Sequence, residues 1–261
     1  MRHLQPFAFM LCLFFTQNTL AQSENVNTLI ARGDSAYAVF DNQAALEYYR
    51  AALERKPEKY AALWRAVRTY SDVGEAESDK DSKRTKFEIA DSLAHKCVAL
   101  YPDSAESHFV LAIALGRMAL FVGGKQKISY SKEIEMAAKT AIALDPTHDG
   151  AHHVLGRWHY EISTLNWFLK AAAKVMYGGV PPGASLEASA EHLRKASELA
   201  PEKILHHLEY ARTLIKLERY SEARPHLERC ATLPPTLWDD NERKQEAAGL
   251  LRKIQGKTDK N

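Results

Sequence analysis

Three arginines recur at one position of a repeating unit, and arginine is a side chain well suited to recognising an anion. A proline ends each unit, at Pro57, Pro102, Pro146 and Pro201, and eleven residues after these prolines stand Arg68, Ile113, Arg157 and Arg212. The planar guanidinium group can pair bidentately with a carboxylate or a phosphate. This arginine row is therefore predicted to hold a carboxylate-bearing peptide or an anionic lipid head.

A second row lies one helical turn before the arginines. Residues four apart share one face of a helix, so both rows should face the same groove. The second row is Trp64, Phe109, His153 and Leu208, and Arg117, Tyr160, Glu161 and Lys216 lie a turn onward. We predict a groove that is aromatic or apolar along one row and cationic along the next. Its expected partner-binding residues are Trp64, Arg68, Phe109, Arg117, His153, Arg157, Tyr160 and Arg212.

Each of these features also has a purely structural interpretation. The arginines could form intramolecular ion pairs, and Arg157 with Glu161 is an obvious candidate at i, i+4. Trp158 and Trp167 could be binding-platform aromatics, but large aromatics at helical spacing more often belong to a core, so we expect packing. Gly156 stands where the other repeats have a small or compact residue, which predicts a close contact between two helices.

The elements that must position these residues are paired helices. Apolar residues recur at i, i+3 or i+4, and i+7 in each unit, as at Leu29, Ile30, Gly33 and Tyr37. The proline then ends the unit because it cannot continue a helix. We predict an all-α fold, an α-solenoid of about five tetratricopeptide-like helix pairs in residues 22–236. The repeats are expected at 26–59, 60–104, 105–148, 149–203 and 204–236.

Several repeats exceed the period of roughly 34 residues typical of this class, so they must carry insertions. Residues 74–83 form a charged run, expected to be a solvated loop or an extended helix end. In the third repeat, Gly123-Gly124-Lys125 predicts a turn, with the second helix opening at Ser131. The fourth repeat should contain an extra amphipathic helix over residues 164–176, buried against the concave surface or the next repeat. Residues 237–256 predict a C-terminal capping helix.

With the repeats in place, the central stretch resembles the regulator of microtubule dynamics family of tetratricopeptide-like proteins. The matching residues are His153-x-Leu155-Gly156-Arg157-Trp158-x-Tyr160, Leu165-x-Trp167, Gly179-x-Pro181-Pro182, Ala196-x-Glu198-Leu199-x-Pro201 and Leu233-Pro234. The Trp167 insertion is not part of the ordinary repeat, which makes the match more specific. The resemblance implies a helical fold, a link to microtubules or membrane contact sites, and phospholipid binding by the helical domain.

Composition and motifs argue against several other classes of function. Lys and Arg number 35 against 33 Asp and Glu, a balance that does not favour nucleic acid binding. His-Glu-x-x-His, Gly-x-Ser-x-Gly and Cys-x-x-Cys do not occur, so we expect neither catalysis nor a cofactor. His108, His152 and His207 share one repeat position, facing the neighbouring helix, and lie too far apart to ligate one metal ion.

The N-terminal residues are typical of an export signal. Arg2 precedes an apolar run over residues 7–15, and Thr19-Leu20-Ala21 is a small-residue cleavage site, which predicts a signal peptide at 1–21 and a periplasmic protein. The run is too short for a transmembrane segment, and none is expected later. Cys97 and Cys230 occupy positions that are alanine in other repeats, which predicts buried, unpaired thiols.

The combined expectation is an exported, non-catalytic scaffold that binds a protein or peptide partner on its concave face. The alternative is a phospholipid- or amphiphile-binding protein, as the family resemblance implies. An exported chain would not meet cytosolic microtubules, so microtubule regulation is not expected.

Overall fold

The computed structural model describes residues 25–179 and 181–259, without the side chains of five residues in the fourth repeat. The expected signal peptide at 1–21 lies outside the described residues. The helices are α2 (Val26–Ala38), α3 (Asn42–Arg55), α4 (Tyr60–Ala76), α5 (Lys80–Leu100), α6 (Ala105–Met118), α7 (Gly124–Leu144), α8 (Asp149–Thr164), α9 (Trp167–Tyr177), α10 (Leu186–Leu199), α11 (Ile204–Lys216), α12 (Tyr220–Thr232) and α13 (Asp240–Lys253).

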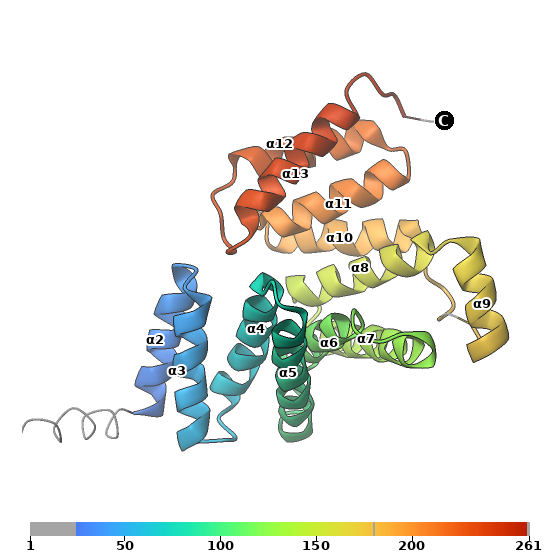
Figure 1. The fold of residues 1–261 in the computed structure, drawn as a ribbon. Helices are drawn as coiled ribbons and strands as arrows, with labels where there is room; N and C mark the ends of the chain where they lie inside the picture. Colours follow the sequence, from blue (N-terminus) through green and yellow to red (C-terminus); the bar gives the residue numbers. More distant parts are fainter. Residues whose placement is uncertain (1–24, 180, 260–261) are drawn as a thin grey trace, which may run out of the picture.

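The helices form the predicted all-α solenoid of tetratricopeptide-like pairs. The pairs are α2 with α3, α4 with α5, α6 with α7, α8 with α10, and α11 with α12. Figure 1 shows them following one another around an open curve, from α2 and α3 (blue) to α11, α12 and α13 (orange to red). Proline follows the second helix of every pair, as its inability to continue a helix requires.

Short polar side chains set where several helices begin. Asp41 accepts a hydrogen bond from the backbone N–H of Ala44, and Ser104 accepts one from the N–H of Ser107. These caps satisfy backbone donors that have no partner inside the helix. Phe40 adopts a positive φ of 66° just before α3, so the chain reverses tightly between the first two helices.

The insertions lengthen helices more than they form loops. The charged run 74–83 extends α4 to Ala76 and starts α5 at Lys80, where Asp79 caps the helix through the Ser82 N–H. The expectation that the second helix of the third repeat opens at Ser131 was wrong, because α7 already begins at Gly124. Gly124 has a φ of 53°, and this left-handed residue completes the tight turn from α6.

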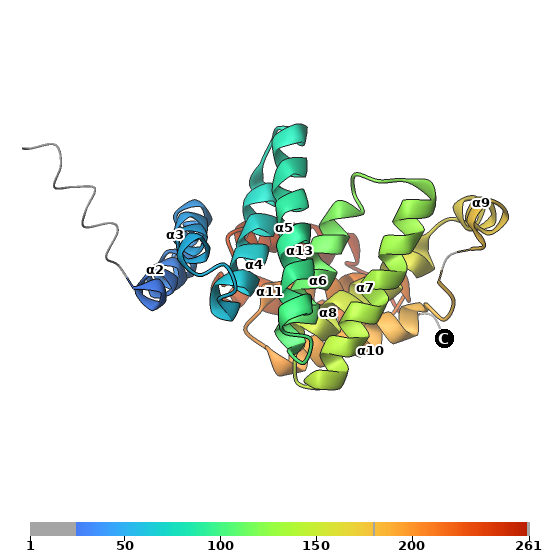
Figure 2. The ribbon, with the colours of Figure 1, turned by 90° about the horizontal axis from the view of Figure 1, so that it is seen from below.

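The extra helix of the fourth repeat is present, as α9. The sequence predicted that it would pack against the concave surface or the next repeat. Its main contacts are instead with α7, in the preceding repeat. Figures 1 and 2 show α9 at the edge of the molecule. Val175 and Met176, near the C-terminal end of α9, are 87% and 65% exposed. No helix among the described residues combines the length and apolarity that crossing a bilayer requires.

Small residues allow the paired helices to approach closely. A Cβ atom at Gly33 would lie 2.4 Å from the Tyr49 ring, and one at Gly156 would lie 2.6 Å from Cγ of Leu193. Val67, Ala112 and Ala211, which share the repeat position of Gly156, are also buried. Cys97 and Cys230 are free and buried, which confirms the expected unpaired thiols.

The capping helix α13 closes the C-terminal end of the core. Ala247 and Ile254 are fully buried in the cluster formed with α11 and α12. Asp240, also fully buried, accepts hydrogen bonds from the backbone N–H groups of Thr236 and Leu237. The segment between α12 and α13 is therefore held in a defined conformation.

The glycines give a direct test of this packing. Gly156→Ala should lower the free energy of unfolding by about 1–3 kcal/mol, because the new methyl group overlaps Leu193. Gly116 is the matched control, since a Cβ there meets nothing within 4 Å. Gly116→Ala should raise the free energy of unfolding by up to about 1 kcal/mol through helix propensity alone. Equal shifts for both variants in chemical denaturation would show that the contact at Gly156 does not limit helix spacing.

Candidate functional site

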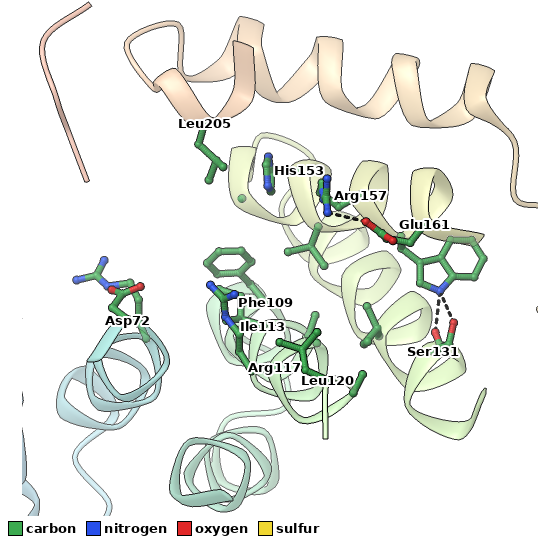
Figure 3. A pocket seen from close by; sticks show the side chains of 18 of the residues that line it. Asp72, Phe109, Ile113, Arg117, Leu120, Ser131, His153, Arg157, Glu161 and Leu205 are labelled. Atoms are coloured by element: carbon green, nitrogen blue, oxygen red, sulfur yellow. Dashed lines mark hydrogen bonds and ion pairs between the residues drawn. The ribbon is translucent and has the colours of Figure 1, made fainter. Parts of the chain in front are cut away.

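A cavity of about 1100 Å³ lies on the inner face of the solenoid. Its walls come mainly from α4, α6, α8 and the start of α11, all of them first helices of their pairs. The α6–α7 turn and α7 form one side, and residues 236–239 form another. Figure 3 shows the side chains of α6 and α8 converging on this space.

The floor of the cavity is largely apolar. Its main apolar side chains are Phe109, Ile113, Leu120, Ile134, Val154, Trp158, Ile162, Leu165, Leu205 and Trp238. Trp158 is 5% exposed and packs in a buried cluster with Leu155, as expected, and its indole N–H donates to the carbonyl and hydroxyl oxygens of Ser131, at 2.8 and 3.0 Å. An apolar floor of this size can remove a substantial hydrophobic group from water.

Arg68 is the least neutralised of the cavity arginines. Its guanidinium carbon lies 3.9 Å from the Tyr37 ring centroid and 5.1 Å from that of Trp64, so two aromatic faces hold it in place. Its buried Nε has no hydrogen-bond partner among the described residues. Asp72 lies nearby and accepts a hydrogen bond from Tyr37, while burial raises the pKa of its carboxyl group. Arg68 therefore has aromatic neighbours and a nearby carboxyl group, where Arg117 and Arg157 have direct ion pairs.

The other arginines of the row form ion pairs within the chain. Arg157 lies 2.6 Å from Glu161, the i, i+4 pair of the structural interpretation, and 2.5 Å from Glu209. Glu209 is only 6% exposed and also pairs with Arg212, which in turn contacts Glu246 of α13. Arg117 pairs with Glu75 at 2.9 Å. A ligand at these arginines would have to compete with existing partners.

The structure brings most, but not all, of the predicted groove residues to the cavity. Those that line it are Arg68, Phe109, Arg117, His153 and Arg157. Trp64 lies beside the Arg68 guanidinium, and Tyr160 beside that of Arg157, but neither is part of the cavity wall. Arg212 is also outside the wall, because α13 packs against α11 and supplies Glu246. The Trp167 side chain lies outside the described part of the structure.

Sequence reasoning missed several residues of the site. Glu209 could have been found, since it stands three residues before Arg212, at ion-pair spacing on one helix. Tyr37 comes from the first repeat, and Trp238 follows the last one. No periodicity indicates that either residue reaches the cavity, because both positions depend on the curvature of the whole solenoid.

Histidines at one repeat position bind the carbonyl group of the preceding proline. The Nε2 atoms of His108, His152 and His207 lie 2.7, 3.1 and 3.0 Å from the carbonyl oxygens of Pro102, Pro146 and Pro201. A carbonyl only accepts, so Nε2 must carry the proton. In His152 and His207, Nδ1 then accepts from His192 and His226 of the paired helix, at 3.1 and 2.9 Å.

A third histidine pair lies in the cavity wall. His153 and His206 approach through their Nδ1 atoms at 3.1 Å, and Nε2 of His206 lies 2.7 Å from Asp149. Burial lowers the pKa of His153 well below its ordinary value, and His206 and Arg157 add to this effect. Burial opposes ionisation of Asp149, but hydrogen bonds from His206 and Lys203 lower its pKa. The described residues include no group of three or more side chains arranged to ligate a metal ion.

The histidine pairs predict a loss of stability in mild acid. Burial and the neighbouring histidine lower the pKa of His192 and of His226 to about 4. The unfolded chain therefore binds more protons below an ordinary histidine pKa of about 6.5, and stability present above that pH is lost as the pH falls towards 4.

The free energy of unfolding, measured by urea denaturation at pH 7.5 and 5, should fall by about 1–2 kcal/mol per histidine. His192→Gln with His226→Gln should reduce this pH dependence, and His95→Gln, at a partly exposed site on α5, should not. An unchanged pH dependence in the double variant would contradict the assignment.

Comparison with known proteins places this arrangement in a family. The family model described as regulator of microtubule dynamics protein 1-3 matches residues 29–255. Regulator of microtubule dynamics protein 2 of Homo sapiens is 24% identical over 239 residues, 91% of this chain and 58% of that protein. Protein 1 of Bos taurus is 28% identical over 210 residues, 79% of this chain and 65% of that protein. The chain thus matches about three fifths of the length of these relatives.

A solved structure supports the fold independently. A thermophilic tetratricopeptide repeat protein of Thermus thermophilus superimposes with a TM-score of 0.64, covering 86% of this chain and 99% of that one, at 17% sequence identity. The repeat register therefore corresponds to a tetratricopeptide-like solenoid. Because the family model covers most of the sequence, the chain belongs to the regulator of microtubule dynamics protein family.

Proposed function

We propose that this chain is an exported, non-catalytic scaffold whose cavity binds a protein or peptide partner through an apolar segment beside an acidic group. The observation that carries the proposal is Arg68, a cation whose buried Nε has no hydrogen-bond partner among the described residues, at the wall of a largely apolar cavity. Tetratricopeptide-like folds of this kind are typical of protein-interaction scaffolds. Microtubule regulation, which the relatives' names suggest, is not proposed for an exported chain.

The chemistry of the cavity defines the ligand. The floor around Phe109, Ile113 and Val154 accepts an apolar side chain, and the Arg68 guanidinium offers N–H donors to a carboxylate. Tyr37 and Trp64 already hold this side chain by cation–π contacts, so little further ordering is needed when a ligand binds. Arg117 and Arg157 border the same space, but each is already paired with a carboxylate.

Selection from a random displayed peptide library tests this proposal without a known partner. Peptides recovered by the wild-type chain should combine apolar residues with Asp, Glu or a free C-terminal carboxylate. Arg68→Met keeps most of the length of the side chain but removes its charge. It should weaken binding of a selected peptide about tenfold or more in fluorescence anisotropy, because a charge-assisted hydrogen bond is lost.

The matched control is Arg219→Met, which removes an arginine from the exposed α11–α12 turn, far from Arg68 in the sequence and absent from the cavity wall. It should leave peptide affinity unchanged. Selected peptides without acidic groups, or equal affinities for wild type and Arg68→Met, would contradict the assignment of Arg68.

A second candidate is a phospholipid or another single amphiphile. It is favoured by the cavity volume of about 1100 Å³, at the upper end of small-ligand sites, and by the length of its apolar floor. Native mass spectrometry of the purified chain should then detect a bound lipid. Ile113→Trp should reduce its occupancy, because the larger side chain fills the floor. A folded protein that repeatedly purifies empty would exclude this candidate and leave the peptide proposal standing.

A further inference from the structure

The α6–α7 turn and α9 form a projecting surface that lies beside the cavity and shares Leu120 with its wall. We call it the α7–α9 tip and define it by Leu120, Lys125, Lys174, Val175 and Met176. α7 packs against α9, and Figures 1 and 2 show α9 next to the N-terminal end of α7, which follows the α6–α7 turn. Leu120 is 64% exposed, and Val175 and Met176 are more exposed than most apolar side chains of this chain.

The two segments that form the tip contain basic residues but no acidic ones, unlike the rest of the chain. Residues 118–132 and 162–186 contain five lysines, at positions 125, 127, 132, 170 and 174, and no aspartate or glutamate. The full sequence, in contrast, is nearly balanced at 35 basic and 33 acidic residues. Lys170 donates to the carbonyl oxygen of Ser163, a neutral partner, so its charge is not compensated there. The tip is therefore locally cationic.

Exposed apolar side chains among lysines match the requirements of one kind of partner. A helix that lies in a bilayer interface inserts apolar side chains between the headgroups, while its lysines attract anionic lipids. α9 has these properties over a short length, with Lys174 next to Val175 and Met176. A folded protein partner would require shape complementarity and hydrogen bonds, for which the tip offers few groups beyond the lysines.

We propose that the α7–α9 tip docks this protein on an anionic membrane surface. Val175, Met176 and Leu120 enter the headgroup region, and Lys125 and Lys174 contact lipid phosphates. Leu120 also lines the cavity, as does Ala173 immediately before Lys174, so docking places one side of the cavity against the bilayer. The other four tip residues are not part of the cavity wall, so the docking can be tested through them separately from the ligand of the cavity.

Flotation of residues 22–261, without the expected export signal and its apolar run, tests the docking with lipid vesicles. The chain should float with phosphatidylcholine vesicles that contain about 30 mol % phosphatidylglycerol, and much less with phosphatidylcholine alone. Raising the salt concentration from about 0.05 M to 0.3 M should weaken binding, because it screens the lysine charges. Lys125→Glu with Lys174→Glu should lower the partition coefficient at least about tenfold. Val175→Asp with Met176→Asp should produce a similar loss at either salt concentration.

Matched control positions lie in the first repeat, away from α7 and α9. Lys56→Glu with Val39→Asp changes an exposed lysine and a 72% exposed valine in the first repeat, and should leave flotation unchanged. Circular dichroism checks that each variant is folded. A labelled Val175→Cys variant gives a second readout, since Cys97 and Cys230 are buried. Its fluorophore should report an apolar environment with anionic vesicles, and one at Val39→Cys should not.

Equal binding to neutral and anionic vesicles, or equal losses for tip and control variants, would overturn the proposal. So would binding of the tip to immobilised polyglutamate without any binding to vesicles, which would assign the surface to an acidic protein partner. Peptide selection with the Lys125→Glu, Lys174→Glu variant should remain as in wild type, so that a failure of membrane docking is distinguishable from a failure of the cavity assignment.

Discussion

The structure depends on the close approach of the two helices in each pair. Gly33 against Tyr49 and Gly156 against Leu193 leave no room for another carbon atom, and alanines fill many of the equivalent positions. This spacing aligns successive pairs, and the alignment turns one face of each first helix inward. The cavity is a consequence of that geometry, because α4, α6 and α8 present their inner faces to the same space. The close packing within each helix pair thus controls the shape of the cavity between the pairs.

Charge is distributed unevenly around this frame. In the C-terminal half, Glu209 joins Arg157 to Arg212, and Asp149 joins His206 to Lys203, so buried charges are paired and hydrogen-bonded. Unpaired buried charges would be costly, and these networks avoid that cost. Arg68 differs, because aromatic rings hold it in place of a carboxylate. The cavity therefore combines ion-paired arginines with one guanidinium that is held mainly by aromatic rings.

The histidines show how one repeat position can serve several purposes. At His152 and His207 the ring both satisfies a proline carbonyl and binds a histidine of the paired helix, so it links the end of one repeat to the core of the next. His153 is the next residue along α8, yet it faces the cavity and pairs with His206. Adjacent positions on a helix point in directions about 100° apart, which accounts for the difference.

The sequence by itself determined the all-helical solenoid and the buried thiols, since both rest on local spacing: proline to proline, or apolar residue to apolar residue. The family followed from the resemblance of the His153–Tyr160 block and the later motifs, and the Arg157–Glu161 pair was one of two interpretations that the sequence left open. The sequence also brought Arg68, Phe109, His153 and Arg157 into one predicted groove. Only the tertiary structure decided that α13 packs beside Arg212, that Tyr37 and Trp238 reach the cavity, and that α9 packs against α7 of the preceding repeat. These positions follow from the curvature of the stacked pairs, which accumulates over the whole chain and has no signature within any single repeat.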